Sequence, residues 1–468
     1  MTGTVGDMAL RELRGAVAGR VLLPGDEGYD DSRTLFNAMI GARPAVIVRC
    51  AGVEDVRAAI ACGRETGLPT AVRGGGHSVA GMSTVEGGLV IDVRDMKEVS
   101  VDPDARTVRC GSGLTWAEFD AATQAHGLAT TGGRVSTTGV AGLTLGGGSG
   151  WLERKHGLTC DNLLAVELVT ADGEHVRASA QERADLFWAL HGGGGNFGVA
   201  TAFEFALAPV GPLVLAGLML WPGSRGSDVI ELMRATIEGG APDDLALGAV
   251  YLTGPPEPFV PAELQGALCC GLAFMWAGAD MREGEAYAEA FRLLRPAADL
   301  VGPMPYVEFQ RMIDDPPGMR NWWTADYLDS LPDAAVAEFV AGSEAMPVPS
   351  ASQSILFPWG GAIARAGGAQ TPMAERQASW VTHPFAVWED AGDDERVIGW
   401  ARGMSARMKA FSSGGVYLNF IGDEGRDRVR AAFGDSYDRL ARVKGAYDPD
   451  NFFRFNQNVR PATATGVG

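Results

Sequence analysis

The chain has 468 residues, of which 46% are hydrophobic, and it is too long for one ordinary domain. Its formal net charge is −19, so its surface would repel the phosphates of nucleic acids. The acidic residues are scattered along the chain, a distribution typical of a solubilising surface. The composition therefore predicts two or three folded domains and excludes nucleic acid as a partner.

Secreted, membrane and metal-binding classes also fit the sequence poorly. The N-terminus lacks the basic start and apolar core of a signal peptide, and the most apolar run, residues 212–221, is too short to span a bilayer. The six cysteines form no CxxC pattern, and the metal-ligand spacing HExxH does not occur. We therefore expect a cytoplasmic protein with free, buried thiols, no membrane partner and no metal site.

Strand and helix patterns alternate through the first 211 residues, after a helical lead-in that we expect over 1–37. Thr115 and Glu118 form a capping-box pattern that opens a helix. The other patterns predict strands at 45–50, 68–73, 88–93 and 198–207, helices at 52–67, 115–126 and 182–190, and hairpins at 97–113 and 163–179.

The composition changes after about residue 211, where glycine clusters become fewer and tryptophan, methionine and other bulky residues more frequent. The segment to about residue 410 mixes strand patterns, such as 245–252, with amphipathic helices, such as 282–294. We expect this segment to shape a substrate pocket.

Three glycine-rich segments lie between the early elements, at 71–78, 132–150 and 192–198. In the first, consecutive glycines precede His77, one of six histidines in the chain. Glycine has no Cβ, so its backbone can approach a ligand closely and its N–H groups can hold phosphate oxygens. If the ligand is a flavin dinucleotide, the imidazole can bond covalently to the isoalloxazine ring. The alternative for this segment alone is an ordinary turn followed by a structural histidine.

The third segment formally matches the GxGxxG motif of nicotinamide-binding proteins, at 193–198. That motif requires a preceding strand, a following helix and, about 20 positions later, an acidic residue that binds a ribose hydroxyl. Here a predicted helix precedes the glycines, a predicted strand follows them, and residues 213–221 contain no Asp or Glu. The context therefore argues against a nicotinamide cofactor.

Longer motifs give a stronger indication. They are AVRGGGHSVAG at 71–81, the pair of segments at 137–163 and 185–199, and YDPDNFFRFNQNVRP at 447–461. Over essentially its whole length the chain resembles the FAD-linked oxidases of the vanillyl-alcohol-oxidase superfamily (PCMH-type), in the berberine-bridge-enzyme-like branch. The resemblance implies an α+β fold. Its expected parts are an FAD-binding domain at 1–211, a substrate domain at 212–410 with an antiparallel sheet flanked by helices, and a C-terminal segment at 411–468 that returns to the FAD domain.

The resemblance also implies that FAD is the cofactor and that His77 is its covalent ligand, through the flavin 8α-methyl carbon. Branch members with a second link attach a cysteine to flavin C6, and that position is Val135 here. Valine cannot form the bond, so a single linkage is expected. Cys160 lies in a different part of the motif and is not assigned to flavin C6.

The same motifs supply further residues that the resemblance places at the cofactor. Thr138 is expected near flavin N5 and the approach of oxygen. For any single glycine, the alternative is a role in turn geometry. The full set of further candidates is Arg73, Gly74, Gly75, Gly76, Ser78, Thr138, Gly139, Gly142, Gly198, Val199, Asn456 and Asn458.

A flavin oxidase also needs a base that takes a proton from the substrate. The best candidate is Tyr417 in GGVYLNF, because family members place a tyrosine over the flavin in a similar segment. A free phenol has a pKa of about 10, so it needs a lowered pKa or a hydrogen-bond partner to act as a base. Asn419 lies two residues on, on the same side of a predicted strand. The alternatives are a simple buried tyrosine and a sheet-packing asparagine.

Weaker candidates lie in the expected substrate domain. Tyr251 is expected on a sheet strand that faces the flavin. Arg320, Trp322 and Trp323 are candidates for shaping the substrate pocket. Many family members have a Glu, Gln or Lys on the substrate-domain sheet near residues 353–365, where this chain offers Gln353 and Arg365.

These residues together predict an FAD-dependent oxidase that takes a hydride from a C–H bond of a small organic substrate. The substrate would be a secondary metabolite, a hydroxylated aromatic or a sugar, and O2 would accept the electrons and form H2O2. One alternative is a flavin dehydrogenase with another acceptor. A second is a non-oxidising ligand-binding or cyclase scaffold on the same fold, which would have no need to keep His77.

Overall fold

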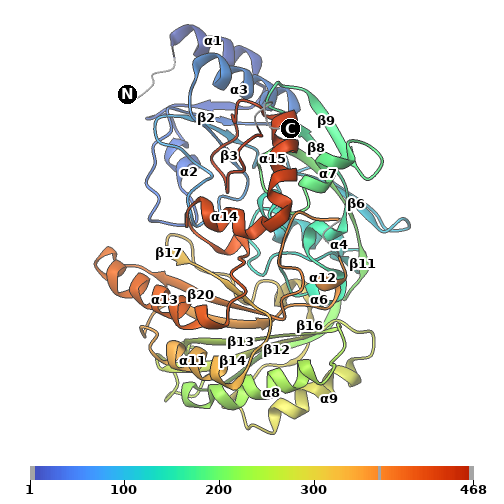
Figure 1. Cartoon of the computed structure of the whole chain (residues 1–468), viewed down its shortest axis with the longest axis vertical. Coiled ribbons are helices and arrows are strands. Elements are labelled where there is room, and N and C mark those ends of the chain that lie inside the picture. The colour runs from blue at the N-terminus through green and yellow to red at the C-terminus, as the bar shows by residue number, and fades with distance from the viewer. Residues whose placement is uncertain (1–5, 367–369, 463–468) are drawn as a thin grey trace.

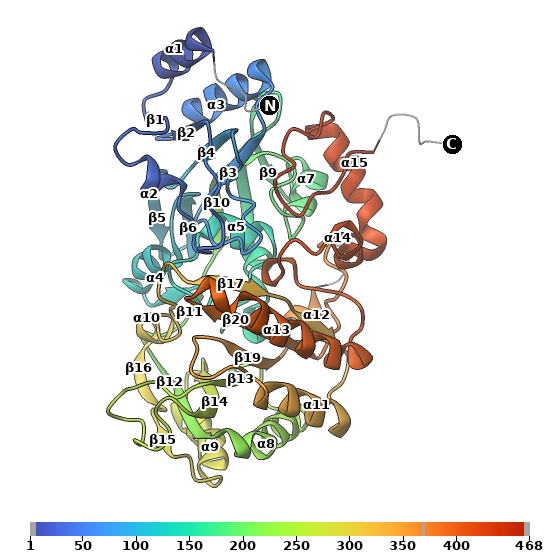
Figure 2. The ribbon, with the colours of Figure 1, turned by 90° about the vertical axis from the view of Figure 1, so that its left-hand side faces the viewer.

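The computed structural model describes residues 6–366 and 370–462. Its elements form two parts, with the N-terminal elements in the upper part of Figure 1 and a large sheet in the lower part. Figure 2 shows the same division from the side. Helices and mainly antiparallel sheets make up both parts, which confirms the α+β fold.

The upper part begins with a small sheet in the strand order β1-β2-β4-β3. β2, β4 and β3 run parallel, and β1 lies antiparallel to β2. The elements are β1 (Arg20–Leu22), β2 (Val46–Arg49), β3 (Thr70–Arg73), β4 (Leu89–Asp92), α1 (Asp7–Ala16), α2 (Tyr29–Arg33) and α3 (Val53–Thr66).

The helical lead-in predicted over 1–37 is wrong in its middle, and its first five residues lie outside the described residues. β1 separates α1 from α2. Val21 lies opposite Val48, and Leu22 opposite Ile47, in the antiparallel register. These apolar residues therefore join the sheet edge instead of a helix.

A second, antiparallel sheet completes the upper part in the order β5-β6-β10-β8-β9. Both predicted hairpins are confirmed, since Asp102 of β5 pairs with Thr107 of β6, and β8 pairs with β9. The capping box also forms, because the N–H of Thr115 donates to the Glu118 carboxylate at 2.9 Å. The elements are β5 (Val99–Asp102), β6 (Thr107–Gly111), α4 (Trp116–Gln124), β8 (Leu163–Val169), β9 (His175–Ser179) and β10 (Val199–Ala206), with a short pair β7 (Leu128–Ala129) and β11 (Ala208–Pro209).

The lower part is a large antiparallel sheet in the order β15-β12-β14-β13-β19-β20-β17, with β16 beside β12 and β18 beside β20. Helices α8, α9, α11 and α13 share one apolar core with one face of this sheet. The strands are β12 (Leu213–Pro222), β13 (Leu245–Thr253), β14 (Leu268–Trp276), β15 (Ala298–Asp299), β16 (Gly302–Pro305), β17 (Arg320–Trp323), β18 (Asp326–Leu328), β19 (Gln353–Pro358) and β20 (Trp380–Trp388). The helices are α8 (Gly226–Glu238), α9 (Met281–Arg292), α11 (Asp333–Glu344) and α13 (Asp394–Met408). In residues 6–366 and 370–462, no helix has the length and apolar character needed to cross a membrane.

Tyr251 lies on β13, which lines the cavity, but its side chain is on the other face of the sheet and does not face the expected flavin. The ring of Tyr251 lies 6.3 Å from the ring of Phe339 in α11, within the helix-covered core. Side chains alternate between the two faces of a strand. Gly248 and Val250 of the same strand therefore face the opposite side, where they line a cavity.

The C-terminal segment returns to the upper part, where α15 packs beside α7 (Figure 1). The fully buried ammonium of Lys444 donates to the carbonyls of Asn196 at 2.7 Å and Phe453 at 2.8 Å, and to the Asp448 carboxylate at 2.6 Å. A buried charge needs a partner for each of its polar atoms, and all three donors are satisfied here. The helices are α7 (Ala184–Ala189), α14 (Arg426–Phe433) and α15 (Tyr437–Tyr447).

Asp120 of α4 marks the contact between the two parts. It is buried, and the side-chain amide of Gln310, just after α10 (Tyr306–Phe309), donates to its carboxylate at 3.0 Å. Burial raises the pKa of Asp120 to about 7, although the Gln310 hydrogen bond lowers it. This carboxyl therefore keeps its proton well above the pH at which an exposed aspartate loses it.

Replacing Asp120 with Asn is expected to remove a pH-dependent loss of stability. The pKa of about 7 in the folded state is above the ordinary value, so wild-type stability falls as the pH rises from about 4 to about 7 and is constant above that. At about 1.4 kcal/mol per pKa unit, the loss amounts to about 4 kcal/mol. Urea unfolding of both proteins at about pH 5 and about pH 8 should detect about 3 kcal/mol of it, the part lost between pH 5 and pH 7. A stability difference that is the same at both pH values would contradict the prediction.

Replacing Lys444 with Met is expected to destabilise the protein by about 3–5 kcal/mol, because the Asp448 carboxylate stays buried without its cation. The matched control is Lys97→Met, which removes a lysine from an exposed pair with Glu118 and should cost less than about 1 kcal/mol. Urea unfolding midpoints compare the two variants. Equal effects would show that Lys444 does not anchor the C-terminal segment.

Candidate active site

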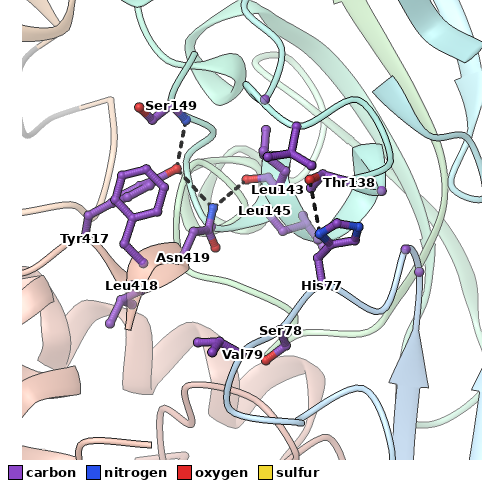
Figure 3. Close-up of a pocket in the computed structure, with 18 of the residues that line it drawn as sticks. His77, Ser78, Val79, Thr138, Leu143, Leu145, Ser149, Tyr417, Leu418 and Asn419 are labelled. Carbon is purple, nitrogen blue, oxygen red and sulfur yellow. Dashed lines mark hydrogen bonds between the residues drawn. The ribbon is translucent and has the colours of Figure 1, made fainter. Parts of the chain in front are cut away.

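A cavity lies between the upper part and the face of the large sheet opposite its helices. Figure 3 shows part of its wall, where segments far apart in the sequence meet. Most predicted site residues belong to the lining, namely Gly74, Gly75, Gly76, His77, Ser78, Thr138, Gly139, Gly142, Gly198, Tyr417, Asn419 and Asn456.

The first and second glycine-rich segments touch through their backbones. A Cβ built on Gly75 would lie 2.3 Å from the amide nitrogen of Gly139, and the reverse distance is also 2.3 Å. Gly76 has a φ of 79°, in the left-handed region that favours glycine. The contact therefore requires glycine on both sides, and it places His77 beside residues 137–138.

The imidazole of His77 is held between an aromatic ring and two hydroxyl groups. Its Nε2 lies 3.1 Å from the hydroxyl of Thr137. Its Nδ1 lies 3.4 Å from the hydroxyl of Thr138 (Figure 3). The ring stacks on Phe36 with 4.2 Å between centroids. Burial lowers the pKa of His77 to about 4, so the ring is neutral near pH 7 and one nitrogen keeps a lone pair.

The glycine-rich walls fit a dinucleotide. Gly142 and Gly195 line the cavity, and a Cβ on either would project into open space. The side-chain amide of Asn456 donates to the Gly195 carbonyl at 3.0 Å, while its side-chain oxygen is buried and has no partner among the described residues. An unpaired buried acceptor is costly, and a ligand that donates a hydrogen bond would satisfy it. The residues present therefore fit FAD, which the backbone of these segments would hold.

Tyr417 occupies the other end of the labelled wall in Figure 3. Its hydroxyl accepts hydrogen bonds from the N–H groups of Gly148 at 2.7 Å and Ser149 at 2.9 Å, and from the side-chain amide of Asn419 at 3.0 Å. A neutral phenol has two lone pairs and a phenolate has three, so three donors match the ionised form. Burial raises the pKa of Tyr417, and these three donors act in the opposite direction.

The strand expected around Tyr417 is wrong. Leu418–Phe420 form a 3-10 turn, which brings the amide of Asn419 back to the Tyr417 hydroxyl. Asn419 also donates to the carbonyl of Leu143 at 3.0 Å, so it ties the turn to α5 (Val140–Leu145).

The stretch of wall beside Ser149 includes aromatic rings and Arg134. Its guanidinium carbon lies 5.0 Å from the ring of Trp151 and 4.7 Å from the ring of Phe357. The guanidinium donates to the Ser149 hydroxyl at 2.7 Å and to the Glu153 carboxylate at 2.5 Å. The charge of Arg134 is therefore neutralised within the wall.

Three residues predicted at the cofactor lie outside the cavity lining. Arg73 donates to the carbonyls of Ser32 and Thr34, so its side chain holds α2 behind the glycine segment. Val199 begins β10 and packs in the apolar core that the small sheet shares with α3. Asn458 lies just beyond the last lining residues of the C-terminal segment.

Among the weaker candidates, Trp323 and Gln353 line the cavity. Arg320 and Arg365 instead form ion pairs with aspartates elsewhere, and Trp322 is not part of the lining.

Three ionisable lining residues were missed by the sequence analysis, namely Arg134, Asp315 and His383. The available signal for His383 was the rarity of histidine and its place two residues before Phe385 in a strand pattern. The other two lie in loops, where no periodicity indicates the direction of a side chain. Within the described ranges, no group of three or more His, Cys, Asp or Glu could hold a metal ion.

Comparison with known proteins agrees with the cavity's chemistry. Residues 44–179 match the family model of an FAD binding domain, and residues 416–460 match the berberine and berberine like family. The first range includes His77 and the second includes Tyr417.

Relatives match nearly the whole chain. (R)-6-hydroxynicotine oxidase of Paenarthrobacter nicotinovorans is 31% identical over 463 residues, covering 95% of this chain and 97% of the relative. The FAD-linked oxidoreductase YgaK of Bacillus subtilis (strain 168) is 29% identical over 458 residues, covering 95% and 97%. The crystal structure of 6-hydroxy-D-nicotine oxidase from Arthrobacter nicotinovorans has a TM-score of 0.84 to this fold at 26% identity, covering 96% of this chain and 99% of that one. The protein is thus an FAD-linked oxidoreductase, and it belongs to the berberine-bridge-enzyme-like family.

Proposed function

We propose that the protein is an oxidase that carries FAD covalently on His77, removes a hydride from a C–H bond of a small organic substrate and passes the electrons to O2, which forms H2O2. The observation that carries the proposal is the Tyr417 hydroxyl, held by three N–H donors in the cavity that His77 also lines. When bound, FAD supplies the hydride acceptor and the route of two electrons to oxygen.

The role of Tyr417 follows from what surrounds its oxygen. When the Tyr417 phenolate takes a proton from a substrate hydroxyl or amine, it becomes a neutral phenol and its negative charge passes to the substrate, which favours loss of the hydride. Before that step the phenolate is stabilised by the N–H groups of Gly148 and Ser149 and the amide of Asn419, which are already in place. Because burial raises the pKa of Tyr417, the phenolate is the minor form near pH 7 and becomes more abundant as the pH rises.

The geometry around His77 supports a single covalent link. A neutral imidazole has a nitrogen lone pair that can bond to carbon, and stacking on Phe36 fixes the plane of the ring. Val135 belongs to the lining, whereas Cys160 is buried outside it, and no cysteine occurs in the described lining. Thr138, whose hydroxyl faces His77, is our candidate for a residue on the path of oxygen.

His77→Ala is expected to release FAD from covalent attachment and to lower activity. The measurement is acid precipitation, which leaves a yellow pellet in the wild type because the flavin stays with the peptide that contains His77. The exposed His126 lies outside the cavity lining, and His126→Ala is the matched control that should keep the yellow pellet. Free FAD in the wild-type supernatant would refute the covalent link and leave the flavoenzyme assignment intact.

Tyr417→Phe is expected to slow flavin reduction by substrate about 10²–10⁴-fold and to leave reoxidation by O2 unchanged. In the wild type, reduction should accelerate about tenfold per pH unit on the acid side of the raised pKa of Tyr417, and the variant should lose this dependence. Stopped-flow absorbance with a substrate found by H2O2 release measures both half-reactions. Tyr437→Phe, outside the cavity lining, is the control. Unchanged reduction in Tyr417→Phe would remove this residue from the mechanism.

The choice of electron acceptor is tested separately. Rapid reduction of an artificial dye without H2O2 release would indicate a dehydrogenase. Failure of every substrate to reduce a bound flavin would favour the scaffold alternative.

A further inference from the structure

The cavity wall formed by β20 carries His383, a residue without a role in the proposed reaction. Its Nδ1 lies 2.8 Å from the carbonyl oxygen of Thr324. A carbonyl can only accept, so Nδ1 of this ring carries the hydrogen and Nε2 has the lone pair. In residues 6–366 and 370–462, Thr324 is the hydrogen-bond partner that the structure gives His383, so the Nε2 acceptor is unused.

The ring of His383 is uncharged and fixed in position. Burial lowers the pKa of His383 to about 4, and the charge of Arg134 makes a smaller contribution in the same direction. The imidazole stacks on Phe420 with 4.3 Å between centroids and 11° between planes. Phe420 also contacts the ring of Tyr417, with 4.7 Å between centroids. One phenyl ring therefore separates a fixed acceptor from the proposed base.

The remaining lining limits the charge of a ligand. Arg134 is paired with Glu153 and is not available to a carboxylate or phosphate. Burial raises the pKa of the Asp315 carboxyl to about 7, with Asp314 adding to the effect. Most other side chains of this part of the lining are aromatic or aliphatic, including Trp323, Ile355, Phe357 and Phe385, and the amide of Gln353, opposite Phe385, is the polar one among them. A sugar would leave many hydroxyl groups unpaired against these side chains, at a cost for each.

We propose that Nε2 of His383 accepts a hydrogen bond from a hydroxyl or N–H group of an uncharged aromatic substrate. The substrate ring would pack among Trp323, Phe357 and Phe385. His383 then selects hydroxylated or amino-substituted aromatic compounds over sugars and acids, and it fixes the orientation in which the substrate meets Tyr417. The part of this inference that concerns the reaction rests on the proposed function. Binding of the substrate at His383 can be measured without turnover.

The test uses the purified flavin-containing protein and two probes, 2-naphthol and 2-methoxynaphthalene. They share one bicyclic ring system, and only the naphthol can donate a hydrogen bond. Equilibrium dialysis gives both dissociation constants. Because one net hydrogen bond is at stake, the wild type should bind 2-naphthol about 3–10-fold more tightly than the ether.

Two substitutions assign that preference to His383. His383→Phe keeps a ring among its aromatic neighbours and removes Nε2, so the ratio of the two constants should fall to about one. His383→Gln supplies a side-chain oxygen that can accept, so part of the preference should return. Tyr417→Phe, which removes the other hydroxyl acceptor, should keep the preference. The bound flavin content of each variant shows that its cavity is intact.

Several outcomes would overturn the inference. They are a wild type that binds neither probe or does not distinguish them, a preference that persists in His383→Phe, and a preference that disappears only in Tyr417→Phe. The comparison of 2-naphthol with 2-methoxynaphthalene in the wild type needs no variant. It can therefore overturn the inference even if a substitution prevents folding. The binding preference and the oxidase activity can fail independently. If the preference for 2-naphthol depends on His383 but the protein produces no H2O2 with any substrate, this inference is supported and the proposed oxidase function is refuted.

Discussion

The geometry of the site depends on one close backbone contact, between Gly75 and Gly139. Neither residue has room for a Cβ, so the segment that ends at His77 lies directly on the segment that opens α5. The contact brings two threonine hydroxyls to the imidazole. The chain continues from α5 to Gly148 and Ser149, whose N–H groups reach Tyr417. The requirement for glycine at positions 75 and 139 thus helps to position both His77 and the N–H groups that bind Tyr417.

Local sequence was sufficient to predict a structural element where the residues that interact in it lie close together in the chain. The hairpin at Asp102 and Thr107 and the capping box at Thr115 are of this kind. β1 was not recognised because its partner, β2, lies beyond α2 and its own pattern is only three residues long. Side chains alternate along β13, so Tyr251 and Val250 lie on different faces, but which of these faces the helices cover depends on packing between distant segments.

The same distinction explains which parts of the site were predictable. The glycine segments lie in long motifs, and Tyr417 was found through the shorter segment GGVYLNF, although its partners Gly148 and Ser149 are distant in the chain. Motif membership did not reveal the direction of the Arg73 side chain, which turns to carbonyls behind the loop. His383 enters the cavity through the register of the large sheet, where it lies opposite Ile355. That register is set by the pairing of β19 with β20, which are separated in the chain by residues 359–379, among them α12 (Ala362–Arg365).

The buried hydrogen bonds and ion pair of Lys444 have a consequence for biosynthesis. Its ammonium joins the carbonyl of Asn196 to the C-terminal segment, and residues 453, 455, 456 and 457 of that segment form part of the cavity wall. While these residues are still inside the ribosomal exit tunnel, the dinucleotide cradle lacks one side. Enclosure of the cofactor on this side therefore follows translation of residues 453–457.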